Sequence, residues 1–119
     1  GGLSGIICYL GVLAKSKLGY DDSLDVVGIH GLGGTWGALA TGLFASTGVN
    51  PAGADGLFFG NPGQLGIQCL TVLVTCVFAF GMSLIIFKLL DWTMGLRVAE
   101  EQEIKGLDLT QHSEGAYSF

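Results

Sequence analysis

One stretch of the chain is too long and too apolar to be the core helix of a small domain. It runs from Leu65 to Leu90, and its single charged side chain, Lys88, lies near its end. A helix needs about 20 mostly apolar residues to cross a bilayer, and a soluble fold of 119 residues has little room to bury a longer one. Because the long side chain of Lys88 reaches the membrane interface from this position, the run predicts a membrane-spanning helix over 65–90.

The charged residues are few and unevenly distributed. They make up 13 % of the chain, against roughly a quarter in soluble domains. Residues 26–54 and 56–87 contain none, whereas eight of the fifteen lie within 91–114. This distribution is typical of apolar membrane spans followed by a solvated tail. Five basic residues against ten acidic ones, without a basic stripe, argue against nucleic-acid binding.

A second apolar segment, residues 24–45, is rich in glycine. Asp22 or Ser23 precedes it and is suited to cap the start of a helix. Gly33 and Gly37 form a pair of small residues four positions apart, which lets helix backbones approach closely in a membrane bundle. We therefore expect a span that packs against other helices, and the alternative is a glycine-rich loop.

The remaining segments indicate how the chain is organised. Residues 1–13 are apolar but too short to cross a bilayer alone, and they lack the features of a signal peptide. We therefore expect the chain to begin inside a helix of a longer protein. Residues 46–64 hold two prolines, five glycines and no Lys or Arg, which is typical of a loop. The loop over 15–23 contains lysines, and the segment after the third span contains basic residues. By the positive-inside rule, the loop and the C-terminal segment both lie on the cytoplasmic side.

His30 is the candidate functional residue, because it is the only ionisable side chain within 26–54. Such a group is costly inside a membrane and faces a cavity or the bundle interior. Neutral imidazole offers one donor and one acceptor, which suits a proton relay or a site for a small polar molecule. A packing hydrogen bond to a neighbouring helix is the alternative, and position alone does not separate the two. Asp25 lies about 140° away on an ideal helix, so we expect it to serve the helix start or to contact another segment.

No catalytic or metal motif accompanies these segments. The three cysteines, Cys8, Cys69 and Cys76, lie in apolar stretches without a C-x-x-C pair or a histidine at metal spacing. We expect buried, inert thiols and no metal or cofactor. A nucleophile elbow G-x-S-x-G is also missing, so we expect no enzyme.

Two long motifs resemble the ammonium transporter (Amt/Mep/Rh) family. Residues 21–45, DDSLDVVGIHGLGGTWGALATGLFA, are similar to that family's signature. Residues 91–117, DWTMGLRVAEEQEIKGLDLTQHSEGAY, are similar to its cytoplasmic C-terminal region and favour the Amt branch. The resemblance implies an all-α membrane protein, with the last three transmembrane helices of an eleven-helix fold within residues 1–92. These helices would span about 1–13, 24–45 and 65–90, and residues 93–119 would form a cytoplasmic regulatory tail.

The resemblance also implies a function and a site. The family moves ammonium or ammonia through an apolar pore with a paired-histidine proton relay, and His30 matches the second histidine of that pair. Val26 matches an apolar pore-lining position, and Asp25, Gly33 and Gly37 are the candidate structural and coupling residues. The family forms homotrimers in the lipid of the cell membrane, with a cytoplasmic C-terminus. An ammonium sensor and a non-transporting membrane fragment remain alternatives.

The acidic run over 100–103 has a simple interpretation as a solvated face. The resemblance implies instead that the tail packs under a neighbouring subunit and couples the pores. Gly106 permits a sharp turn before Asp108, and Thr110 falls where some plant members are phosphorylated. Bacterial members bind a P-II signalling protein at this face. The candidate tail residues are Gly106, Asp108, Thr110 and Tyr117.

Overall fold

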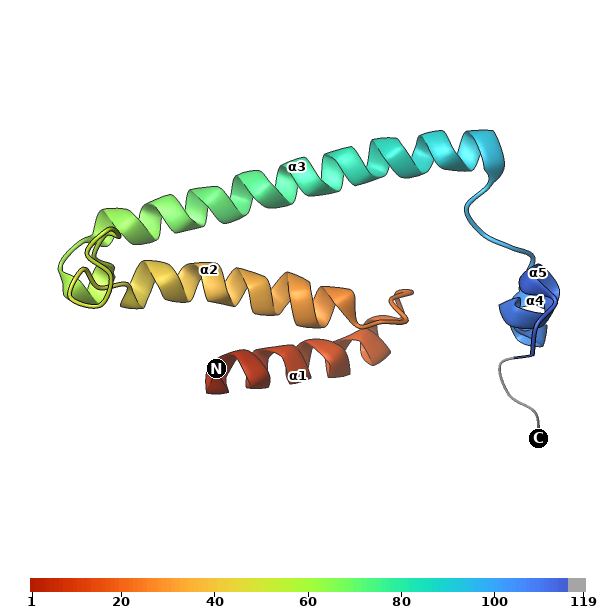
Figure 1. The fold of residues 1–119 in the computed structure, drawn as a ribbon, viewed down its shortest axis with the longest axis horizontal. Coiled ribbons are helices and arrows are strands. Elements are labelled where there is room, and N and C mark those ends of the chain that lie inside the picture. Colours follow the sequence, from red (N-terminus) through yellow and green to blue (C-terminus); the bar gives the residue numbers. More distant parts are fainter. Residues whose placement is uncertain (116–119) are drawn as a thin grey trace. The chain divides into compact units, whose positions relative to one another are not determined.

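Helices make up most of residues 1–115, the part of the chain that the computed structural model describes (Figure 1). In order they are α1 (Gly2–Leu18), the π-helix η1 (Val27–Leu32), α2 (Gly33–Phe44), the 3-10 helix η2 (Leu57–Phe59), α3 (Pro62–Met94), α4 (Glu100–Lys105) and α5 (Leu107–His112). No strand occurs within residues 1–115. This content agrees with the all-α class expected from the sequence. Tyr117, one of the candidate tail residues, lies outside the described residues.

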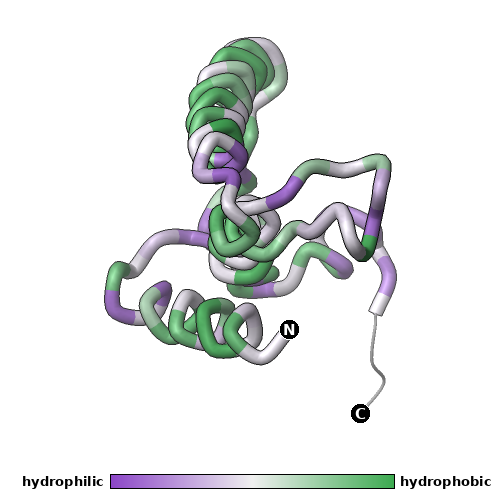
Figure 2. The backbone as a smooth tube through the Cα atoms, turned by 90° about the vertical axis from the view of Figure 1, so that its left-hand side faces the viewer, coloured by the Kyte–Doolittle hydropathy of each residue, from purple (hydrophilic) through white to green (hydrophobic). Residues whose placement is uncertain are grey.

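Among the described helices, α3 alone is long and apolar enough to cross a membrane. It contains 33 residues, none of them buried, and Figure 2 shows it mostly in the green of hydrophobic residues. It extends beyond the predicted range of 65–90 at both ends. Pro62 suits the first helical position, where no amide hydrogen bond is required. Gly95, with φ of 76°, ends the helix in the left-handed conformation typical of a C-terminal glycine.

The chain divides within α3 into two parts, residues 1–77 and 78–119. In the first part α1 packs against η1 and α2, and α2 packs against η2. The η1–α2 segment runs antiparallel to α1, since Gly28 lies against Gly11 and Gly33 against Cys8. A connection over 45–61 then leads into α3 (Figure 1).

The sequence predicted a helix from residue 24 through the second apolar segment. The segment is helical, but the helix starts later and is not a regular α-helix at its beginning. Its first six residues form η1, and the chain continues without a break into α2. The helix starts late because Asp25 has a left-handed backbone, with φ of 56°. Asp22 is the cap: its two carboxylate oxygens accept the amides of Val26 and Val27, each at 2.9 Å. The alternative of a glycine-rich loop is therefore wrong.

Glycines make the close contacts of the first part. The buried positions of residues 1–115 are Gly11, Gly28, Gly42 and Gly56, and no hydrophobic side chain in that range is buried. An added Cβ at Gly28 would lie 3.0 Å from the Val12 amide nitrogen and 3.2 Å from the Gly11 carbonyl carbon. Because both neighbours are backbone atoms that cannot rotate away, α1 and η1 approach this closely only without side chains at the crossing.

The second part, residues 78–119, ends with two short helices in its described range. α4 and α5 contact each other, and Gln111 donates a side-chain hydrogen bond of 3.2 Å to Gln102. Gly106 makes the turn between them with φ of 97°. Arg97 and Glu103 form a two-pronged ion pair, with Nε–Oε1 at 2.7 Å and Nη2–Oε2 at 2.9 Å. This pair joins the segment after α3 to α4.

We expect Gly28→Ala to separate α1 from η1, because its Cβ meets backbone atoms, with a cost of about 1–3 kcal/mol. Cys8 is half-buried beside this contact, so its thiol should react faster with a maleimide in a Cys69→Ser, Cys76→Ser background. Gly34→Ala is the matched control, because its Cβ meets nothing within 4 Å. Equal labelling rates in the two variants would contradict the close crossing.

The hydrogen bond from Arg97 lowers the pKa of Glu103 below its ordinary value. A carboxyl group with a depressed folded pKa adds stability above its unfolded pKa and loses that contribution as pH falls through the folded value. We therefore expect the contact between Arg97 and α4 to weaken on acidification into the range where Glu103 is protonated. Carbon-13 NMR of the Glu103 carboxyl measures the midpoint, and Arg97→Gln should raise it. An unchanged midpoint in that variant would show that Arg97 is not the cause.

Candidate functional site

His30 lies inside η1, on the side of that helix turned away from α1. Its neighbours two positions away on either side both contact α1: an added Cβ at Gly11 would lie 3.0 Å from the Gly28 Cα and 2.8 Å from the Leu32 Cδ1. Two residues along a helix correspond to about half a turn, so His30 projects from the opposite side. Its side chain is exposed and makes no side-chain hydrogen bond within residues 1–115. The alternative of a packing hydrogen bond therefore finds no partner in that range.

Val26, the candidate pore-lining residue, lies four positions before His30 at the start of the helix. Its side chain is 46 % exposed, so it is free to line a surface shared with other segments. Its amide is held by Asp22. The structure thus places Val26 and His30 about one turn apart on the same stretch of helix.

The π-helical geometry of η1 has no counterpart in the sequence prediction. A π-helix bonds each amide to the carbonyl five residues back, is rare, and is frequent at functional sites when it occurs as a short segment. Here the Cys8 thiol donates to the Ile29 carbonyl at 3.6 Å. Gly33 makes room for that thiol, because a Cβ there would lie 2.6 Å from the Cys8 sulfur. Hydrophobic periodicity does not distinguish this geometry from an α-helix, and only the density of glycines hinted at close contacts.

The environment of the cysteines differs from the prediction of buried thiols. Cys8 is half-buried and uses its thiol as a donor, whereas Cys69 and Cys76 are exposed on α3. The prediction of burial was wrong for Cys69 and Cys76, because no residue of α3 is buried. No group of three or more His, Cys, Asp or Glu suited to a metal ion occurs in residues 1–115.

Charged groups hold the start of η1. Lys15, near the end of α1, donates to the Asp22 carbonyl oxygen at 2.9 Å and forms an ion pair with the Asp25 carboxylate. The sequence analysis expected Asp25 to serve the helix start or to contact another segment, and the ion pair with Lys15 is such a contact. Asp25 forms no hydrogen bond with His30 within residues 1–115. Lys15 was not singled out from the sequence. The signal for it was weak, because a lysine in a short loop is usually solvated.

Of the candidate glycine pair of α2, Gly33 and Gly37, only Gly33 makes a close contact with another helix in residues 1–115. Gly33 lies against Cys8, whereas a Cβ at Gly37 would meet no atom within 4 Å. Gly37 instead lines a shallow groove with Ala40 and Thr41 on the surface of α2. The close approach to α1 therefore centres on Gly11 and Gly28.

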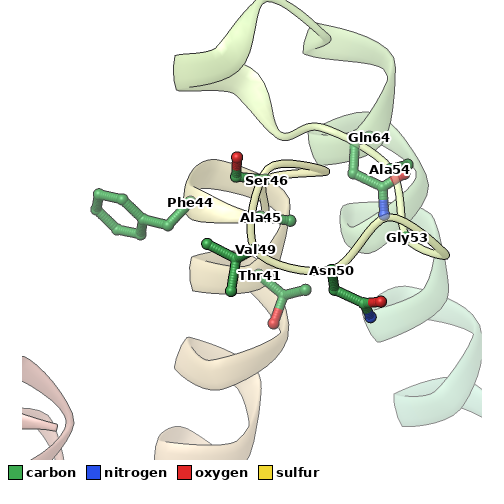
Figure 3. Close-up of a pocket in the computed structure, with 9 residues that line it drawn as sticks. All are labelled: Thr41, Phe44, Ala45, Ser46, Val49, Asn50, Gly53, Ala54 and Gln64. Atoms are coloured by element: carbon green, nitrogen blue, oxygen red, sulfur yellow. The ribbon is translucent and has the colours of Figure 1, made fainter.

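A cavity of about 400 Å³ lies at the far end of α2 from His30 (Figure 3). Figure 3 shows Val49 and Asn50 of the loop near Thr41, with the ring of Phe44 directed away. In the same loop, the Asp55 carboxylate accepts the amide and hydroxyl of Thr47 at 2.7 and 3.0 Å. The lining has hydroxyl and amide groups but no charged side chain, so it is not an acid–base site. Its nine residues are Thr41, Phe44, Ala45, Ser46, Val49, Asn50, Gly53, Ala54 and Gln64.

The candidate tail residues belong to the second part of the chain. Thr110 is half-buried, and its hydroxyl donates to the Gly106 carbonyl at 2.9 Å. Asp108 lies in the first turn of α5, where a carboxylate is favourable. Gly106 and Thr110 thus belong to one small turn structure.

Comparison with known proteins gives a single consistent result. The sequence profile described as the Ammonium Transporter Family matches residues 1–117. The chain is 50 % identical over 116 residues to an ammonium transporter of Bacillus subtilis, covering 97 % of this chain and 29 % of that protein. It is 46 % identical over 116 residues to Ammonium transporter Amt1 of Archaeoglobus fulgidus, covering 98 % and 29 %. It is 46 % identical over 109 residues to Ammonium transporter 1 of Dictyostelium discoideum, covering 92 % and 24 %.

The chain therefore spans less than a third of the length of these relatives. The long apolar helix α3 agrees with the membrane location that such relatives imply. Because the match extends over nearly every residue, and includes both the η1–α2 segment and the tail, the chain belongs to the ammonium transporter family.

Proposed function

We propose that this chain forms the C-terminal part of a transporter that moves ammonium or ammonia across the cell membrane. The observation that carries the proposal is His30, the one ionisable side chain of residues 26–54. It lies on a π-helix and is exposed on the side away from α1. The relatives of the chain are named ammonium transporters. Because they are more than three times as long as the matched part, other helices are available to face His30.

The chemistry of the substrate explains the need for an imidazole. An ammonium ion pays a large desolvation cost in an apolar pore, whereas neutral ammonia does not. Transport therefore proceeds by deprotonation, passage of ammonia and a separate path for the proton. His30 accepts a proton on one ring nitrogen and releases one from the other. Val26 supplies apolar wall one turn away, and a second imidazole comes from a part of the transporter outside this chain.

The apolar surface supports this assignment to a larger membrane assembly. No hydrophobic side chain of residues 1–115 is buried, and large ones are exposed along α1, η1 and α3. Soluble monomers rarely expose contiguous apolar patches beyond a few hundred Å². Lipid, other helices of the transporter and neighbouring subunits of a homotrimer cover this surface. The tail lies in the cytoplasm, on the same side as Lys15 and Lys17.

The tail has a regulatory role in this proposal. Its short helices contact the neighbouring subunit and, in a bacterial cell, a P-II signalling protein. A phosphate on Thr110 adds about −1.5 to −2 charges and removes the hydroxyl donor. The Gly106 carbonyl then keeps only the Thr110 amide as a donor and faces the phosphate oxygens, so α5 is displaced.

A chimera tests the role of His30. Residues 1–117 replace the matching segment of the Bacillus subtilis relative, in cells that lack ammonium uptake. We expect the chimera to restore uptake, and His30→Ala to reduce it sharply or to abolish the accompanying current. His112→Ala, at the other histidine, is the control and should leave the charge moved per ammonium unchanged. Currents of normal size in His30→Ala would refute the relay, and an inactive chimera would favour a sensor or a non-transporting fragment.

The same chimera tests the tail. We expect Thr110→Asp to reduce uptake several-fold at equal protein level, because it replaces the hydroxyl donor to the Gly106 carbonyl with a carboxylate that can only accept. Thr110→Ser retains the hydroxyl donor and should transport normally. Unchanged uptake in Thr110→Asp would remove this residue from the regulatory site.

A further inference from the structure

An ion pair reaches from α1 to the start of η1. The Lys15 ammonium contacts the Asp25 carboxylate and the Asp22 carbonyl oxygen. The side chains of Lys15 and Asp25 are only 23 % and 29 % exposed. This pair is therefore better shielded than an ordinary surface pair, whose contribution is small. Breaking it leaves a charge that is partly removed from water.

Asp25 is the residue at which the helix begins. Its carbonyl accepts the Ile29 amide at 2.9 Å, while its own backbone has a φ of 56°. A left-handed backbone is strained for a residue other than glycine, although Asp tolerates it better than most. Such strain persists only where surrounding contacts hold it, and the contact with Lys15 is the one that crosses from another helix.

A second contact with α1 holds the other end of η1. Cys8 donates to the Ile29 carbonyl and lies against Gly33. From Cys8 to Lys15, α1 has seven residue steps, whereas the facing segment from Asp25 to Gly33 has eight. A π-helix accommodates one residue more per hydrogen-bonded ring than an α-helix. Between the two contacts the facing segment thus holds one residue more than α1, and a π-helix accommodates such a residue.

We propose that Lys15 and Asp25 are positioning residues that hold η1 in its π-helical register and so set the direction of His30. This inference rests on the proposed function of His30. Without the pair, Asp25 relaxes to an ordinary helical backbone and the start of the helix slips. A slip of one residue turns a side chain by about 100°, which takes the imidazole away from its partner.

The test uses the active chimera with Lys15→Met. We expect maximal uptake to fall on the order of tenfold at equal membrane level, with a changed ratio of charge to ammonium moved. Lys15→Arg keeps a cation with several donors and should restore most uptake. Lys17→Met is the matched control, because Lys17 is exposed two residues later on the same helix and has no ion pair within residues 1–115. A loss of protein alone would lower uptake without changing the charge ratio.

A second measurement does not depend on transport. The labelling rate of Cys8, in a background without the other cysteines, should rise in Lys15→Met and in Asp25→Asn but not in Lys17→Met. If the unsubstituted chimera moves no ammonium, the proposed function fails, and the labelling still decides whether the pair holds the register. The inference is overturned if Lys15→Met labels and transports like Lys17→Met. It is equally overturned if Lys15→Met and Asp25→Asn simply fail to accumulate, since the pair would then serve folding alone.

Discussion

The backbone contact between Gly11 and Gly28 is the constraint on which the first part of the chain depends. No hydrophobic side chain of the described residues is buried, so the packing that usually holds helices together is lacking there. The helices instead meet where side chains are absent, and a Cβ at Gly28 would collide with the backbone of α1. Van der Waals contact between backbones is the usual basis of helix association in membranes. This crossing turns one side of η1 toward α1 and leaves the other side, with His30, open.

In the proposed transporter, the π-helix η1 connects this packing to His30. Its start is held by Asp22 and by the pair of Lys15 and Asp25, and its end by Cys8 against Gly33. A functional side chain is positioned best when rigid contacts fix the backbone beneath it. In the proposed transporter, contacts on one side of η1 would therefore fix an imidazole on the other side.

The sequence predicted the main elements because their signals are local. The apolar run over 65–90 predicted α3, and Pro62 and Gly95 explain why the helix is longer than that run. Asp22 or Ser23 was predicted as the cap from its position before an apolar segment, and the structure shows Asp22 in that role. The motifs around His30 and in the tail indicated the ammonium transporter family, which the comparisons confirm. The cysteines were misjudged because an apolar neighbourhood in sequence does not tell whether another helix covers a side chain.

The sequence by itself determined that the chain is helical, apolar and a member of this family, and that a single histidine lies within a glycine-rich helix. Composition and short motifs suffice for these properties, since each depends on neighbouring residues. Only the tertiary structure decided that this helix begins as a π-helix, that Gly28 rather than Gly37 meets α1, and that Lys15 reaches Asp25. The contacts at η1 come from residues much earlier in the chain, with Lys15 on Asp25 and Cys8 on Ile29. Hydropathy and helix propensity depend on the local sequence and therefore do not predict such contacts.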